Sequence, residues 1–472
     1  MSGPIILGTN SIKDTGYDVD NSLMFNSPSS DRLNRTLGTP TNNYKWTYSF
    51  WVKRGILGSE DAITGAISDN QNKSIILFRT DDQFEIMDLQ SDSYVMQKKT
   101  SRKFRDPSAW YHFVISSDAT LSSPETKIYV NGVEETSFAT TNEYSQNQAN
   151  LWNSAIANHI GASDSTSRFW DGYLAEFVFI DGQVLDPTSF GEFDSNSPNI
   201  WKPIDVSDLT FGNNGYYLDF KDSSNLGNDA NGGTDWTVSN LAATDQSIDT
   251  CTNNFATLNP LNPIVHTFSE GNLRLKGTTT NWDSACSTIA ASSGKWYFEM
   301  KFLALYNSLR RAAIGLVDAR DQTLLATNEF GYIVTGAVGD CVGYNGNGSN
   351  NVKKNDSAQY SGTNWNVNDI ICMAADLDNG AVYFRVNDSA WENSGNPESG
   401  ASKTGAVTIT VGEDYVFGGT AYGNTTDWQF NYGAPSFSIS SGNADANGHG
   451  NFEYAVPSGY FSLCTKNLAE FG

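Results

Sequence analysis

The stretch KIYVNGVEE, residues 127–135, carries the pattern that decides the fold. Its apolar and polar side chains alternate, as in a strand with one buried face. Asn131 and Gly132 then supply the two positive-φ residues that a type I′ turn requires. The same pattern recurs at AVYFRVND, residues 381–388. The sequence therefore predicts two related hairpins, each in its own β-sandwich and at equivalent places in the two domains.

The length and net charge of the chain limit the number of domains and the kinds of partner that can be expected. A chain of 472 residues is too long for a single hydrophobic core, so two main domains are expected. Hydrophobic residues at 39% and aromatic residues at 12% suffice for packed cores, and the mean hydropathy is -0.41. With 53 acidic against 29 basic residues, the net charge is -24. Such a field repels phosphate backbones and anionic headgroups, so neither nucleic acid nor membrane insertion is expected.

Cysteine usage and the first residues favour assembly in the cytoplasm. The beginning MSGPIILGTN has no basic region before its short apolar run, so no secretory signal is predicted. The five cysteines are odd in number and lack CxxC spacing, which favours free thiols. Cys372 alternates with Ile370 and Ala374 in a predicted strand, and is expected to be a small core residue.

Strand patterns dominate the chain. Before residue 195 they predict strands at 46–52, 74–78, 84–87, 110–115 and 173–180, with one or two helical turns at 187–193. After residue 266 they predict strands at 295–302, 312–317, 331–334, 370–377 and 415–421. Residues 201–263 are rich in Asn, Asp and Gly, and cannot form a core alone, so they are expected to pack on a neighbour. These patterns favour antiparallel sandwiches.

Several segments resemble known families. YSFWVKR (48–54) and FWDGYLAEFVFIDGQVLDPTSFGEF (169–193) resemble a laminin G-like, concanavalin-type jelly roll, in the version found in virion proteins of tailed phages. GKWYFEMKF (294–302) and DIICMAADLDNGAVYFRVND (369–388) resemble a SPRY domain, which is also a concanavalin-like sandwich. The connector and PSGYFSLCTKNL (457–468) resemble the corresponding segments of the same phage proteins.

The predicted fold class is therefore all-β, with two antiparallel concanavalin-like jelly-roll sandwiches in tandem, joined by a turn-rich connector. The predicted divisions are an N-terminal arm at 1–20, a laminin G-like sandwich at 21–195, a connector at 196–266, a SPRY-like sandwich at 267–436 and a tail at 437–472.

No catalytic residue, metal ligand or cofactor is predicted. The Glu-x-Asp-x-x-Glu motif that supplies the catalytic carboxylate pair of laminarinase-type enzymes is absent. Glu85 and Asp88 are expected on opposite faces of a strand, so they cannot form such a pair. Glu176 is expected to be a polar position between core residues. The four histidines are isolated, which disfavours zinc, and His112 is expected to be a hydrogen-bonded sheet residue.

The acidic connector leaves two interpretations open. Calcium prefers several oxygen ligands, and the connector offers Asp222, Asp229, Asn231 and Asp235 close together. The segment lacks the glutamate of an EF-hand loop, and self-capping Asx turns are the alternative.

Carbohydrate binding needs exposed aromatic faces beside polar groups. The candidate ligand-binding residues lie where loops are expected to gather, and are Trp170, Asp171, Asn387, Asp388 and Trp391. For each tryptophan taken singly, packing in the core or at its rim is favoured over ligand contact.

The resemblance implies a non-enzymatic structural protein of a tailed-phage virion surface, in a fibre, spike or capsid decoration, that presents lectin-like domains to host-surface glycans. Expected partners are other virion proteins and further copies of the chain. Expected localisation is the virion surface, after assembly in the host cytoplasm and release by lysis. The alternatives are a polysaccharide depolymerase, which requires two acidic side chains facing each other across a cleft, and a purely architectural virion protein.

Overall fold

The computed structural model describes residues 16–262, 266–332, 336–346 and 351–472. The described chain forms two compact units, 16–252 and 253–472. Most of the predicted arm (1–15) and part of the predicted strand at 331–334 lie outside the described residues.

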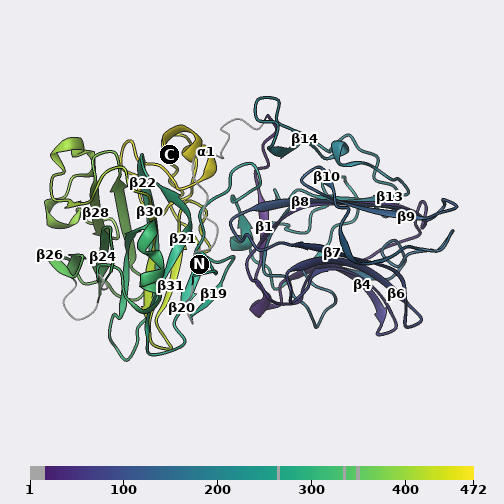
Figure 1. Ribbon diagram of the computed structural model, residues 1–472, viewed down its shortest axis with the longest axis horizontal. Coiled ribbons are helices and arrows are strands. Elements are labelled where there is room, and N and C mark those ends of the chain that lie inside the picture. Colours follow the sequence, from purple (N-terminus) through teal and green to yellow (C-terminus); the bar gives the residue numbers. More distant parts are fainter. Residues whose placement is uncertain (1–15, 263–265, 333–335, 347–350) are drawn as a thin grey trace. The chain divides into compact units, whose positions relative to one another are not determined.

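The first unit consists of two eight-stranded sheets that face each other (Figure 1). In one, the order is β10 (Val133–Glu134), β9 (Glu125–Val130), β8 (Trp110–Asp118), β3 (Lys45–Arg54), β13 (Gly172–Asp181), β1 (Ser22–Phe25) and β18 (Gln246–Ser247), with β16 (Tyr216–Leu218) also paired to β13. In the other, the order is β11 (Phe138–Asn142), β7 (Ser93–Lys103), β6 (Gln83–Gln90), β5 (Asn72–Phe78), β4 (Asp61–Asp69), β12 (Ala157–Ile160), β2 (Arg32–Thr36) and β17 (Thr237–Ser239). A separate pair joins β14 (Gly191–Phe193) and β15 (Trp201–Pro203).

The second unit also has two sheets. One has the order β19 (Thr267–Ser269), β20 (Arg274–Lys276), β31 (Asp427–Asn431), β22 (Lys295–Ala304), β27 (Ile370–Asp376), β28 (Ala381–Val386) and β29 (Val407–Thr408). The other has the order β21 (Trp282–Ala291), β30 (Tyr415–Tyr422), β23 (Ala312–Asp318), β24 (Cys341–Asn345), β25 (Asn351–Lys354) and β26 (Ser357–Ser361). The only α-helix among the described residues is α1 (Thr465–Phe471).

All ladders between these strands are antiparallel, which confirms the predicted fold class. The predicted alternation is seen directly in β3, where Tyr48 and Phe50 enter the core between the sheets while Trp51 packs on the outer face. In β22, Phe298 and Met300 likewise face the second core. Cys372 is fully buried, and all five cysteines are free.

The turn-rich connector is built into the first sandwich. Its short strands β16, β17 and β18 pair with β13, β2 and β1. Asp249, three residues before the end of the unit, forms a buried ion pair with Lys53 of β3. The first unit therefore extends to residue 252, whereas the sequence placed the end of the sandwich at 195. Strands of two or three residues are too short to show the alternation that would predict this pairing.

The tail likewise belongs to the second unit. Leu463 and Leu468 pack in its main core, and the buried carboxylate of Glu299 accepts hydrogen bonds from the backbone N–H groups of Glu453 and Tyr454. The second sandwich thus continues beyond the predicted end at 436, and α1 was not predicted. Where a helical turn was predicted, a 3-10 turn forms at Pro187–Ser189.

The strands that carry the two repeated patterns, β9 and β28, occupy equivalent places in their sheets. In the first unit β3 is followed across the sheet by β8 and then β9, and in the second unit β22 is followed by β27 and then β28. The Asn131 N–H donates to the His112 carbonyl at 2.9 Å and its Oδ1 accepts from the His112 N–H at 2.8 Å. Asn387 makes the same two bonds with Ile370, at 2.7 and 2.9 Å.

The turns that follow differ. Asn131 and Gly132 have φ of 49° and 77°, and Val133 pairs with Val130, so the predicted tight hairpin is confirmed. Asn387 also has a positive φ, 53°, but no strand pairs directly after it, and the next partner of β28 is β29. The prediction of a second tight hairpin at Asn387 and Asp388 was therefore wrong. The chain there leads into loops that cover the sheet.

Glu176 sits in a bulge of β13 with a φ of 48° and is buried. One carboxyl oxygen accepts from the Tyr217 hydroxyl at 2.7 Å, and the other has no hydrogen-bond partner among the described residues. Burial raises its pKa to about 7. The folded state therefore retains this proton between about pH 4.5 and 7, where the unfolded chain has released it.

Stability should consequently fall as the pH rises from 5 to 8. Because Glu176→Gln removes the titrating group, the free energy of unfolding of this variant should decrease less over that interval, by roughly 1–3 kcal/mol relative to wild type. Denaturant titrations of wild type and variant at pH 5 and 8 measure this difference. An equal decrease in both proteins would contradict a raised pKa of Glu176 in the folded state.

Candidate functional site: a surface pocket beside the first hairpin

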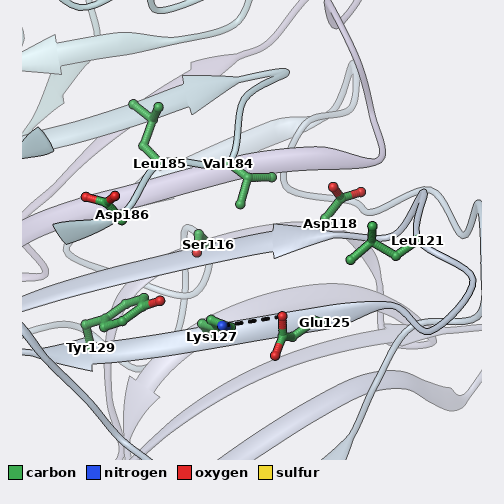
Figure 2. A pocket seen from close by; sticks show the side chains of 9 residues that line it. All are labelled: Ser116, Asp118, Leu121, Glu125, Lys127, Tyr129, Val184, Leu185 and Asp186. Carbon is green, nitrogen blue, oxygen red and sulfur yellow. Dashed lines mark ion pairs between the residues drawn. The ribbon is translucent and has the colours of Figure 1, made fainter. Parts of the chain in front are cut away.

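The outer face of β8 and β9 carries an open pocket of about 250 Å³ in the first sandwich (Figure 2). Three segments line it: the end of β8 with the loop after it, the outward side of β9, and the segment after β13. The lining residues are Ser116, Asp118, Leu121, Glu125, Lys127, Tyr129, Val184, Leu185 and Asp186.

The β9 wall is formed by the outward positions of this strand, and Lys127 and Tyr129 among them belong to the stretch that decides the fold. Glu125, Lys127 and Tyr129 lie side by side along the strand (Figure 2). The Lys127 ammonium lies 3.5 Å from Glu125 and 3.9 Å from Glu134, so its charge is balanced locally. The Tyr129 ring is partly buried against an apolar cluster that includes Leu185. This wall therefore offers an anchored aromatic surface between charged groups.

The β8 wall combines a polar floor with an exposed apolar edge. Ser116 is buried at the floor, and Leu121 in the following loop is 44% exposed. Burial alone would raise the pKa of Asp118, but the hydrogen bonds from Thr120 and the ion pair with Lys45, at 3.0 Å, outweigh it and lower that pKa. Asp118 is therefore held as a carboxylate.

The opposite wall is held in place by hydrogen bonds that involve side chains. The Leu185 N–H donates to the Thr47 hydroxyl of β3 at 2.9 Å. Asp186 caps the 3-10 turn that follows, accepting from the backbone N–H of Thr188 at 2.9 Å and from its hydroxyl at 2.6 Å. Val184 is 43% exposed. The pocket thus places apolar side chains beside carboxylates on a rigid sheet face.

The field in the pocket is negative. Partial burial contributes most to raising the pKa of the Tyr129 hydroxyl. The negative charges of Glu134, Asp186 and Glu125 raise it further. Lys127 opposes them without reversing the shift.

Comparison with known proteins places this pocket in a recognised fold. Residues 29–188 match the concanavalin A-like lectin/glucanases superfamily. The matched span contains all three walls of the pocket. This lectin-like segment points to carbohydrate binding. No curated protein sequence matches the chain.

Solved structures give weaker likenesses. The SPRY domain of human HERC1 is 10% identical, with a TM-score of 0.29, and 37% of this chain covers 96% of it. A heptameric SAP-like pentraxin from Limulus polyphemus is 17% identical, with a TM-score of 0.28, and 36% of this chain covers 80% of it. A putative carbohydrate binding protein from Bacteroides ovatus is 14% identical, with a TM-score of 0.33, over 47% of this chain and 58% of that one. They carry no functional argument.

The candidate residues at the start of β13 do not line the pocket of the lectin-like segment. Trp170 is fully buried, and its ring centroid lies 5.8 Å from that of Phe78 in the core. Asp171 is also buried, where its carboxylate accepts from the Ser27 N–H at 3.3 Å. Of the two roles considered for Trp170, the structure shows packing in the core, so this ring is not available to a ligand.

The second candidate group belongs to the other unit, and its members lie together. The Asn387 Oδ1 accepts from the N–H of Ile370 at the start of β27. Asp388 is exposed beside Arg385 at 3.5 Å, and the Arg385 guanidinium lies 4.9 Å from the Trp391 ring centroid. Trp391 is partly buried and also packs edge-on against Tyr383, so its ring is engaged within the unit. These three residues line none of the described pockets.

The two equivalent strands, β9 and β28, differ in how their outer faces are covered. In the second unit the outer face of β28 is covered by the chain itself, so that Tyr383 is only 1% exposed and packs among residues of the tail and the loops after β28. In the first unit the corresponding face of β9 stays open as the pocket. The place in the second unit that corresponds to the pocket is therefore filled by the protein's own side chains.

Other polar candidates have structural roles. Both ring nitrogens of His112 are hydrogen-bonded, to the Ser49 hydroxyl and the Trp201 indole N–H, each at 2.9 Å, and burial lowers its pKa to about 3. In the connector, Asp222 caps Ser224 in an Asx turn and Asp229 pairs with Arg35 at 3.2 Å. Across the described ranges, no three or more His, Cys, Asp or Glu residues are arranged to hold a metal ion. None of the described helices is long and apolar enough to cross a membrane.

Proposed function

We propose that the chain is a non-enzymatic carbohydrate-binding protein that holds a sugar residue in the pocket over β8 and β9. The observation that carries the proposal is the pocket's mixed lining. Sugars present apolar C–H faces and hydroxyl donors, which suit Tyr129, Leu121 and Val184 beside the carboxylates. At about 250 Å³ the pocket is smaller than typical drug-sized sites, and fits one terminal sugar residue.

The carboxylates favour binding over hydrolysis. A glycosidase needs a general acid with a raised pKa, and the pKa of Asp118 is lowered. Glu125 is paired with Lys127, and Asp186 is engaged as a cap. The position of Asp186 across the pocket from the carboxylates of β8 and β9 keeps a depolymerase as the second candidate (Figure 2). Release of reducing ends from a bound polysaccharide would favour it.

The test of carbohydrate binding is a glycan array probed with the full chain. Binding to a group of glycans that share one terminal sugar is expected. An array without hits would contradict the proposal, and would favour the purely architectural alternative.

We further propose that this protein stands on the surface of a tailed-phage virion, in a fibre, spike or capsid decoration, together with other virion proteins or further copies of itself. The support is the sequence resemblance of the connector and of residues 457–468. Mass spectrometry of purified virions should detect the chain, and antibodies against it should label intact particles. A chain absent from virions would contradict this part of the proposal.

A further inference from the structure

We propose that the pocket selects a sugar carrying a free amino group over the N-acetylated or uronic-acid form of the same sugar. This inference rests on the proposed function of the same pocket and adds the chemical class of its ligand.

The charge balance of the lining is the first argument. Asp118, Glu125 and Asp186 supply three carboxylates against the single ammonium of Lys127, a net charge of -2. Including the nearest charged partners outside the lining, Lys45 and Glu134, leaves that value unchanged. A carboxylate ligand would enter an already negative site, whereas an ammonium would gain from it.

The excess charge is concentrated on one residue. Asp118 is paired with Lys45, and Glu125 with Lys127. Asp186 has hydrogen bonds from Thr188 but no ion pair within the part of the chain that the structure describes. Both of these bonds go to Oδ1, and Figure 2 shows Asp186 on the side of the pocket opposite β9. Asp186 is therefore the group best placed to accept an ammonium.

The remaining lining explains why the ligand is a sugar rather than a simple cation. The exposed Leu121 and Val184, together with the Tyr129 ring, are unsuited to a hydrated metal ion, which needs several converging oxygens. They suit the C–H face of a pyranose. The combination of an apolar surface with one uncompensated carboxylate favours a protonated 2-amino sugar.

The test compares three disaccharides that differ only at the terminal residue: glucosamine, N-acetylglucosamine or glucuronic acid. Titration calorimetry of the full chain at pH 6 and low salt should give an affinity for the glucosamine form roughly five-fold higher than for the N-acetyl form, as expected for one exposed ion pair. The glucuronic acid form should bind most weakly. The preference should shrink as salt screens the charges.

Asp186→Asn is the informative variant, because asparagine still caps the 3-10 turn but carries no charge. It should abolish the preference, so that the glucosamine and N-acetyl forms bind with equal affinity. The matched control is Asp205→Asn, since Asp205 is an exposed acidic turn cap outside the pocket lining, accepting from the Ser207 N–H at 2.9 Å. The control should retain the preference.

The outcomes separate this inference from the function on which it rests. Equal or tighter binding of the N-acetyl or glucuronic acid form by wild type would overturn the amino-sugar inference and leave carbohydrate binding intact. A preference that survives Asp186→Asn would also overturn it. Failure of all three disaccharides together with an array without hits would overturn both.

Discussion

Replacing Lys53 by methionine is expected to lower the free energy of unfolding of the first sandwich by about 3–5 kcal/mol. The Lys53 ammonium lies 2.6 Å from the Asp249 carboxylate, and both side chains are 1% exposed. Asp249 also accepts from the Trp110 indole N–H at 3.1 Å. Burial lowers the pKa of Lys53, while the charge of Asp249 acts against that shift. Without Lys53, the Asp249 carboxylate would be left buried without its cation.

Denaturant unfolding followed by tryptophan fluorescence measures this loss. Lys221→Met is the matched control, since Lys221 pairs with Asp20 at 3.4 Å with both side chains largely exposed, and should cost less than about 1 kcal/mol. Equal small losses in the two variants would show that Asp249 is not held in the first sandwich, and would contradict a first unit that extends to residue 252.

Replacing Tyr129 by alanine is expected to weaken sugar binding at least ten-fold, or by about 1.4 kcal/mol or more. Tyr129 provides the aromatic surface of the pocket and is partly anchored by the apolar cluster beside it. Calorimetry with a glycan selected from the array measures the change, and the thermal transition checks that the fold is kept.

Tyr94→Ala is the control for this experiment. Tyr94 is a 46% exposed tyrosine of β7 in the same unit and lies outside the pocket lining. Its removal should leave affinity unchanged. Unchanged affinity in the Tyr129 variant, or equal losses in both variants, would place the sugar elsewhere.

The main strands could be predicted from the sequence because their information is local. Alternation in β3 and β22 decides which side chains face the core, and Asn131 with Gly132 decides the turn after β9. The extent of each unit could not be predicted in the same way. Strands of two or three residues, such as β17 and β18, acquire their structure from the edges with which they pair, and those edges lie far away in the chain.

One wall of the candidate site could be predicted from the sequence, and the opposite wall could not. The outward positions of Lys127 and Tyr129 followed from alternation, but nothing local indicated that residues 184–186 would form the facing wall. The same limitation explains the predicted role of Trp170. A tryptophan before a strand can face solvent or the core, and only the packing against Phe78 decides between them.

The most direct test of the account is a crystal structure of the full chain with an array-selected oligosaccharide. The account predicts its terminal sugar between β9 and residues 184–186, with the apolar face of the ring against Tyr129 and polar groups directed at Asp186. A saccharide bound at another surface, with this pocket empty, would contradict it.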